Sequence, residues 1–157
     1  MRALLTNNHA IGELRNAKVI EGANVKIDGG CHCGFIGYQA EADPANTAIC
    51  NCTDCQRLSG SAFRTVVPVD SKSFRMTGEP TVYVKTGDSG NKRQQTFCPR
   101  CGSPIYSAPP TDGPRLLYLR VGTINQRDQF VPQSQVWARS QQAWVDRVAA
   151  IPKNEKQ

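Results

Sequence analysis

Seven cysteines form three tight clusters, and their spacing predicts metal binding. The sequence holds a CxC pair, a CxCxxC triplet and a CxxC pair, which are Cys31 and Cys33, then Cys50, Cys52 and Cys55, then Cys98 and Cys101. Thiolates one or two residues apart can bind the same tetrahedral zinc ion, which takes four ligands in a structural site and three protein ligands in a typical catalytic site. Two pairs and one triplet therefore predict two zinc ions per chain, one with closed coordination and one with an open position.

Two other interpretations of the cysteines are open. A disulfide framework would leave one of the seven thiols unpaired, and we expect no secretory signal because residues 1–10 have no apolar run of sufficient length. A thioredoxin-like redox CxxC lies near a βαβ unit, whereas Cys101 is followed by Gly102, Ser103 and Pro104, which cannot open a long helix. Zinc, or another soft divalent ion with the same ligand preference, explains the pattern better.

The two cysteine pairs are predicted to share the closed site. They are far apart in the sequence, and zinc ribbons commonly join two such pairs across facing hairpins. Gly30 and Gly34 flank the first pair and Gly102 follows the second, so the backbone can turn and direct its amides at thiolate sulfur. Such a four-cysteine site would be structural, with metal binding coupled to folding.

The triplet has no fourth cysteine to complete its coordination. The fourth ligand is expected to be water, a substrate thiolate or one of the two histidines, His9 and His32. We favour an open position, because a zinc-bound thiol is deprotonated and can attack an electrophile such as an aldehyde. Two alternatives stay open: the triplet is structural, with one cysteine rearranging into the other site, or it is a labile metal site without function.

The segments between the clusters are typical of short strands and turns. We therefore expect a mainly β fold, made of small antiparallel sheets assembled around the zinc sites, with little helix. Thirteen glycines and ten prolines fit many turns. The pattern predicts a hairpin from residues 73–76 and 81–85, a central strand at 116–121 and an edge strand at 130–137 that contains Pro132.

The chain is expected to form one domain. We assign residues 27–151 to a single zinc-binding β domain, preceded by an N-terminal extension, residues 1–26, and followed by a polar tail, residues 152–157. Within the domain, one helical turn is expected at 53–58 around the triplet, and a short helix at 141–149.

The composition argues against nucleic-acid and membrane partners. The formal net charge is +6, but seven thiolates contribute −7 and two Zn²⁺ ions contribute +4, which leaves about +3. The basic residues are scattered, and Lys92-Arg93 is their one adjacent pair. No stretch approaches the ~20 apolar residues of a membrane span. We expect a cytoplasmic protein, since metal-binding thiols must stay reduced.

Several motifs in combination resemble the glutathione-dependent formaldehyde-activating enzyme family. The resemblance covers about residues 27–148 and starts at the first cysteine pair. It is carried by Gly29-Gly30-Cys31-His32-Cys33-Gly34, Tyr38, the CxCxxC triplet with Gly60 beyond it, Phe97-Cys98-Pro99-Arg100-Cys101-Gly102-Ser103-Pro104, Gly122-Thr123-Ile124, and the tail formed by residues 132–137, Ser140 and Trp144.

The resemblance implies the Mss4-like fold of small antiparallel sheets. It implies one structural zinc held by the two cysteine pairs, and a second zinc at the triplet, near the place where the thiol of glutathione would bind. The implied activity is that of a carbon–sulfur lyase which forms S-hydroxymethylglutathione from formaldehyde and glutathione. A small-molecule thiol and an aldehyde are then the expected partners, with glutathione as the cosubstrate.

Basic side chains are the candidates for substrate contacts. Arg57, Arg64 and the Lys92-Arg93 pair can bind the carboxylates of glutathione. The sequence departs from the family's common pattern at Asn51, inside the triplet, and at Gln135, in the tail, where relatives often have histidine. Neither departure removes a zinc ligand.

Two functions of other classes are also compatible with the sequence. A non-catalytic zinc-stabilised module could bind a protein or a nucleic acid, with Trp137 and Trp144 either as contacts or as core residues. A sensor of formaldehyde or thiols, or a zinc store, is the other. The triplet favours an enzyme, because a pure binding module needs only the four-cysteine site.

Overall fold

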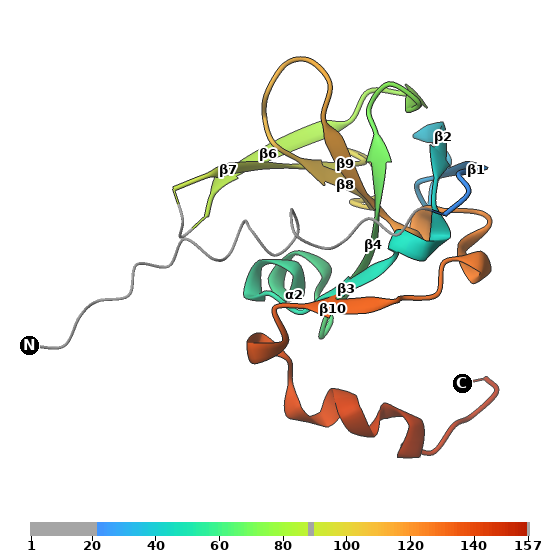
Figure 1. Ribbon diagram of the computed structural model, residues 1–157, viewed down its shortest axis with the longest axis vertical. Helices are drawn as coiled ribbons and strands as arrows, with labels where there is room; N and C mark the ends of the chain where they lie inside the picture. The colour runs from blue at the N-terminus through green and yellow to red at the C-terminus, as the bar shows by residue number, and fades with distance from the viewer. Residues whose placement is uncertain (1–21, 88–89, 157) are drawn as a thin grey trace, which may run out of the picture.

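The protein is mainly β, as the sequence predicts. The computed structural model describes residues 22–87 and 90–156, which contain ten strands in two sheets and a single α-helix (Figure 1). The predicted N-terminal extension lies mostly outside the described residues. The first strand begins at Val25, two residues before the predicted start of the domain.

The smaller sheet has three antiparallel strands in the order β1-β2-β5. They are β1 Val25–Gly30, β2 Gly37–Ala42 and β5 Arg75–Thr77. β1 and β2 form a hairpin that starts at the Gly30–Gly37 pair. The turn of this hairpin carries the first cysteine pair.

The larger sheet has seven strands in the order β10-β3-β4-β9-β8-β7-β6. All neighbours in it are antiparallel except β10 and β3, which are parallel. The strands are β3 Ala48–Cys50, β4 Arg64–Asp70, β6 Thr81–Thr86, β7 Lys92–Phe97, β8 Pro104–Ala108, β9 Leu116–Arg120 and β10 Ser134–Val136. The predicted central strand at 116–121 is therefore confirmed as β9, which lies between β4 and β8.

The main apolar core joins the smaller sheet to one face of the larger sheet. Successive residues of a strand point to opposite faces, so Leu117 and Leu119 of β9 lie in this core while Tyr118 packs on the other face. Arg120, at the end of β9, shares the face of Tyr118. One face of the larger sheet is thus committed to the core, and the other is free to carry polar groups.

Helical structure is short, as expected. The α-helix α2 spans Thr53–Ser59. Cys52 is its N-cap, with a sulfur that accepts a hydrogen bond from the amide of Cys55, and Gly60 is its C-cap, in the left-handed conformation. This confirms the predicted turn around the triplet. The other helices are 3₁₀: η1 Pro44–Asn46, η2 Val121–Thr123, η3 Arg127–Gln129, η4 Ala138–Ser140 and, at the predicted C-terminal helix, η5 Ala143–Ala150.

The hairpin predicted from residues 73–76 and 81–85 is wrong. β5 pairs with β2 in the smaller sheet, whereas β6 pairs with β7 in the larger one. Met76 packs against the main core, which draws β5 onto β2. The chain then turns at Gly78, where φ is +78° and an added Cβ would lie 2.2 Å from the carbonyl oxygen of Phe35.

The edge strand at the C-terminal side is shorter than predicted. β10 spans only Ser134–Val136, so Pro132 lies before the strand and does not interrupt its hydrogen bonds. Figure 1 shows β10 and β3 side by side, with α2 next to them. Among the described residues, no helix is both long and apolar enough to span a membrane.

Two leucines of β9 provide a test of the two-faced sheet. Leu119 is fully buried, whereas Leu116 is 45% exposed. We expect Leu119→Ala to lower the free energy of unfolding by about 2–5 kcal/mol, because it leaves a cavity in the core. The matched Leu116→Ala change should cost less than about 0.5 kcal/mol. Urea unfolding of the metal-loaded variants measures both, and equal losses would contradict this placement of the core.

Candidate functional site

The two cysteine pairs meet in space. The sulfur atoms of Cys31, Cys33, Cys98 and Cys101 all lie within 4.8 Å of one another. The sulfur of Cys33 is 3.6 Å from that of Cys31 and 3.7 Å from that of Cys98. Ligands 2.3 Å from a tetrahedral zinc are about 3.8 Å apart, whereas disulfide sulfurs are about 2.05 Å apart. This four-cysteine group can hold a metal ion, and none of the cysteines is in a disulfide.

Two similar turns form the four-cysteine group, one from each sheet. In the β1–β2 turn, the amide of Ile36 donates to the sulfur of Cys31 over 3.2 Å. In the β7–β8 turn, the amide of Gly102 donates to the carbonyl of Cys98 over 2.9 Å. The amide of His32 donates to Ser103 Oγ over 3.1 Å and so connects the turns, while the His32 side chain is exposed. The group therefore links the two sheets.

The triplet forms a second group at the start of α2. Cys50 ends β3, Cys52 is the N-cap of the helix and Cys55 lies in its first turn. Their three sulfurs lie within 4.8 Å of one another, and no other described His, Cys, Asp or Glu completes the set. His9 lies outside the described residues. This three-cysteine group offers a soft, incomplete set of donors of the kind that binds zinc with a position open.

The three thiols influence one another strongly. Hydrogen bonds to Cys52 and Cys55, followed by burial, raise the pKa of Cys50. Hydrogen bonds from Cys50 and Cys55 lower the pKa of Cys52 to about 2. Cys52 is therefore the thiol of the group that ionises most readily. A bound cation would favour the thiolate form of all three.

A pocket of about 430 Å³ opens over the three-cysteine group. This volume lies within the range of small-molecule sites. The pocket lies between α2, the polar face of the larger sheet and the segment after β10. Four basic residues line it, against one acidic residue; they are Lys85, Arg93, Arg120 and Arg139, and the acidic residue is Asp54. The lining favours an anionic ligand.

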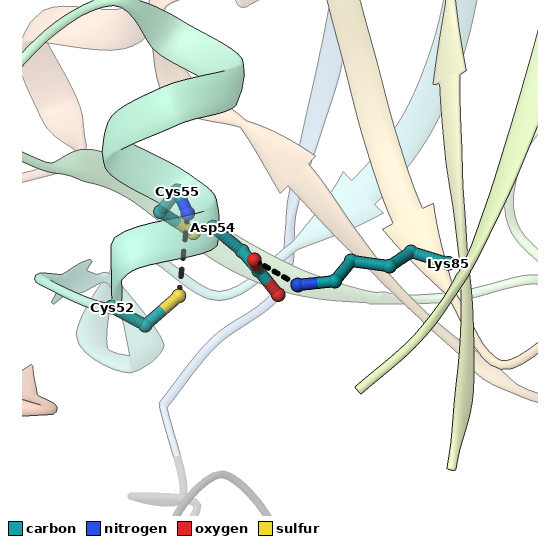
Figure 2. A network of polar contacts seen from close by, with 4 residues as sticks. All are labelled: Cys52, Asp54, Cys55 and Lys85. Carbon is teal, nitrogen blue, oxygen red and sulfur yellow. Dashed lines mark hydrogen bonds and ion pairs between the residues drawn. The ribbon is translucent and has the colours of Figure 1, made fainter. Parts of the chain in front are cut away.

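An ion pair between α2 and β6 lies in the pocket lining. Asp54 on α2 reaches Lys85 on β6, next to the contact between the Cys55 amide and the Cys52 sulfur (Figure 2). Both side chains are more than a third exposed, so the pair contributes at most about 1 kcal/mol to stability. Its main consequence is that the first turn of α2 is tied to a strand of the larger sheet.

The predicted substrate arginines lie at different depths. Arg57, on α2, does not line the pocket but borders a neighbouring hollow with Leu58 and Tyr83. Arg64 is only 6% exposed and lies at the start of β4, with its Cα paired to that of Cys50. Of the predicted Lys92-Arg93 pair, Arg93 lines the pocket and stacks over the ring of Tyr118 at 5.6 Å.

The sequence analysis missed Arg120 and Gln95. Arg120 Nη2 donates to Gln95 Oε1 over 2.9 Å, and Arg64 Nη1 donates to the same oxygen over 3.3 Å. Burial, followed by the charge of Arg64, lowers the pKa of Arg120 to about 10, so the guanidinium stays charged at neutral pH. Strand alternation could have revealed Arg120, because it shares a face with Tyr118 and not with the core leucines.

The two departures from the family's pattern contact each other. The side chain of Asn51 is fully buried, and its Nδ2 donates to Gln135 Oε1 over 3.1 Å. The pair connects the triplet to β10. Gln56 of α2 strengthens the same connection, because its Nε2 donates to the carbonyls of Asn51 and Ser140, each over 2.8 Å.

Trp137 forms part of the pocket wall in an uncommon conformation. It follows β10 with φ +60° and ψ +37°, the left-handed region, which costs a bulky residue of the order of 1 kcal/mol. Arg139 stacks over its ring at 4.7 Å, and both residues line the pocket. Trp144, the other predicted contact residue, is 49% exposed and lies outside the pocket lining.

Comparisons with known proteins agree with this architecture. The sequence profile of the family described as "Glutathione-dependent formaldehyde-activating enzyme" matches residues 26–140, which include both cysteine groups and every residue that lines the pocket. A crystal structure of a Rhodobacter sphaeroides protein has a TM-score of 0.53 and 20% sequence identity, and the match covers 69% of this chain and 99% of that chain. That likeness concerns the fold alone. The chain belongs to the glutathione-dependent formaldehyde-activating enzyme family.

Proposed function

We propose that this protein is a zinc-dependent carbon–sulfur lyase that forms or cleaves a thiol–aldehyde adduct resembling S-hydroxymethylglutathione. The observation that carries the proposal is the group of Cys50, Cys52 and Cys55, which lacks a fourth protein ligand and lies in a cation-lined pocket. In this proposal the zinc at the triplet is catalytic. The zinc at Cys31, Cys33, Cys98 and Cys101 is structural and completes the pair of ions in each chain.

Zinc bound at the triplet would supply a Lewis acid that keeps a substrate thiol deprotonated at neutral pH. The thiolate sulfur bonds to the carbonyl carbon of the aldehyde, the π electrons of the carbonyl move to its oxygen, and that oxygen takes a proton from water. The reverse reaction breaks the same carbon–sulfur bond. Much of the rate gain comes from holding the two reactants together in the pocket.

Basic side chains of the wall orient the rest of the thiol substrate. Arg93 and Arg139 are each stacked on an aromatic ring, which directs their guanidinium groups and leaves edge donors for carboxylates. Glutathione, with two carboxylates, is the cosubstrate that this wall fits best. Arg57, in the neighbouring hollow, would contact only a ligand that extends beyond the pocket along α2.

Cysteine substitutions test the division between the two metal groups. We expect Cys52→Ser to fold, because serine also caps a helix, and to retain one of two zinc ions. Cys31→Ser should lose folded structure together with the metal, because Cys31 is buried in the turn that links the sheets. Zinc per chain and far-UV circular dichroism give the result. An unfolded Cys52→Ser protein would contradict a separate catalytic zinc.

The activity itself is tested by the rate at which glutathione and formaldehyde interconvert with their adduct, measured by exchange NMR above the spontaneous rate. Loss of outer partners of a metal site commonly costs 10–100-fold, so loss of a ligand in Cys52→Ser should cost more than about 100-fold. Trp144→Ala is the control, since Trp144 lies outside the pocket lining, and it should keep the wild-type rate. A wild-type protein with two zinc ions and no acceleration would favour a binding module instead.

A further inference from the structure

Two arginines lie beneath the three-cysteine group on the polar face of the larger sheet. Residues that pair directly across neighbouring antiparallel strands share a face. The pairs Cys50–Arg64 and Val66–Arg120 therefore place both arginines on the face that carries Cys50. Arg120 lines the pocket, and Arg64 lies behind it.

Both guanidinium groups are buried, and neither forms an ion pair with a carboxylate of the described residues. Arg64 and Arg120 are each 6% exposed, and the single ion pair among the described residues joins Lys85 to Asp54. The two arginines share one neutral acceptor, Gln95 Oε1. Their Nε atoms have no hydrogen-bond partner among the described residues. Buried charges are normally paired, because an isolated one is costly.

We call the three-cysteine group together with Arg64 and Arg120 the pocket floor. The charges of the floor indicate which kind of ligand would complete the coordination of a bound metal ion. Three thiolates contribute −3, one divalent ion +2 and the two arginines +2, which leaves +1. One further monoanion brings the total to zero. A neutral ligand such as water or an imidazole would leave this net charge of +1 uncompensated at a buried site.

We propose that Arg64 and Arg120 make the open position of the three-cysteine group selective for an anionic ligand, the thiolate of the substrate. This inference rests on the proposed function. Arg120 contacts the ligand, and Arg64 is a positioning residue that acts through Arg120 and Gln95. When the thiolate adds to the aldehyde, the negative charge moves from sulfur to the carbonyl oxygen, and the floor stabilises it in both places until the oxygen takes a proton from water.

This role differs from that of the arginines in the pocket wall. Arg93 and Arg139, which stack on aromatic rings, are proposed to bind carboxylates, so their contribution depends on which thiol is bound. The floor recognises the thiolate itself, which all thiols share. The loss of Arg120 should therefore weaken the binding of a thiol without carboxylates, such as 2-mercaptoethanol, as strongly as the binding of glutathione.

The sharpest variant is Gln95→Glu, because it keeps both arginines and changes only the charge between them. A carboxylate there pairs with both guanidinium groups, so we expect thermal stability equal to or above that of the wild type. The same carboxylate removes the excess positive charge. Binding of 2-mercaptoethanol and of glutathione should weaken by about 10- to 100-fold.

Binding is measured by titrating the cobalt-loaded full-length protein with each thiol and following the sulfur-to-metal absorption. Arg120→Met should weaken the binding of both thiols by a similar factor, whereas Arg120→Lys, which keeps the charge, should recover part of the lost affinity. Arg139→Gln is the matched control and should weaken the binding of glutathione alone. Cobalt content and thermal unfolding verify that each variant is folded and loaded.

The outcomes separate the inference from the proposed function. A stable Gln95→Glu protein that binds both thiols like the wild type would overturn the role of the arginines, while the thiol site itself would stand. If Arg120→Met weakened the binding of glutathione but not that of 2-mercaptoethanol, the proposed role would also be overturned, because Arg120 would then contact a carboxylate of glutathione. A cobalt-loaded wild-type protein that binds neither thiol would overturn the proposed function and this inference together.

Discussion

The rest of the structure depends on the contact between the two cysteine turns. Cys31 and Cys33 lie in a turn of the smaller sheet, and Cys98 and Cys101 lie in a turn of the larger one, with all four sulfurs within 4.8 Å. The chain is lean in apolar residues, at 39%, so the single main core between the sheets is modest. A metal ion bound between these turns would stabilise such a domain. It would also hold one face of the larger sheet against the core.

With one face committed to the core, the opposite face can build a polar site. Strand alternation places Cys50, Arg64, Arg120 and Gln95 together there, although the four residues come from four different strands. The helix α2 then covers this face and brings Cys52 and Cys55 to Cys50. The ion pair between Asp54 and Lys85, shown in Figure 2, connects the helix to β6, the strand at the other edge of the same sheet.

Electrostatics distinguishes the two cysteine groups. The four-cysteine group has a complete set of four donors, and the amide of Ile36 donates to the sulfur of Cys31, so the group needs no further ligand to bind a tetrahedral ion. The three-cysteine group is incomplete and lies above two buried arginines. In the role we propose, its choice of ligand depends on the charge of the ligand as well as on the softness of the donors. The buried contact between Asn51 and Gln135 couples this group to β10, and the strained Trp137 directly after β10 forms part of the pocket wall.

The sequence by itself predicted how the cysteines are grouped, because the spacing within each motif is a local property. The CxC, CxCxxC and CxxC motifs divide into four and three without any knowledge of the fold, and the mainly β class with one helical turn at 53–58 follows from local patterns. Only the tertiary structure decided which basic residues meet the triplet. Arg120 and Gln95 are 65 and 40 residues from Cys55, and they join it through strand register, which local sequence does not encode. For the same reason the sequence misplaced β5, which pairs with β2, where the partly buried Met76 packs against the main core, and not with the strand beyond the nearest turn.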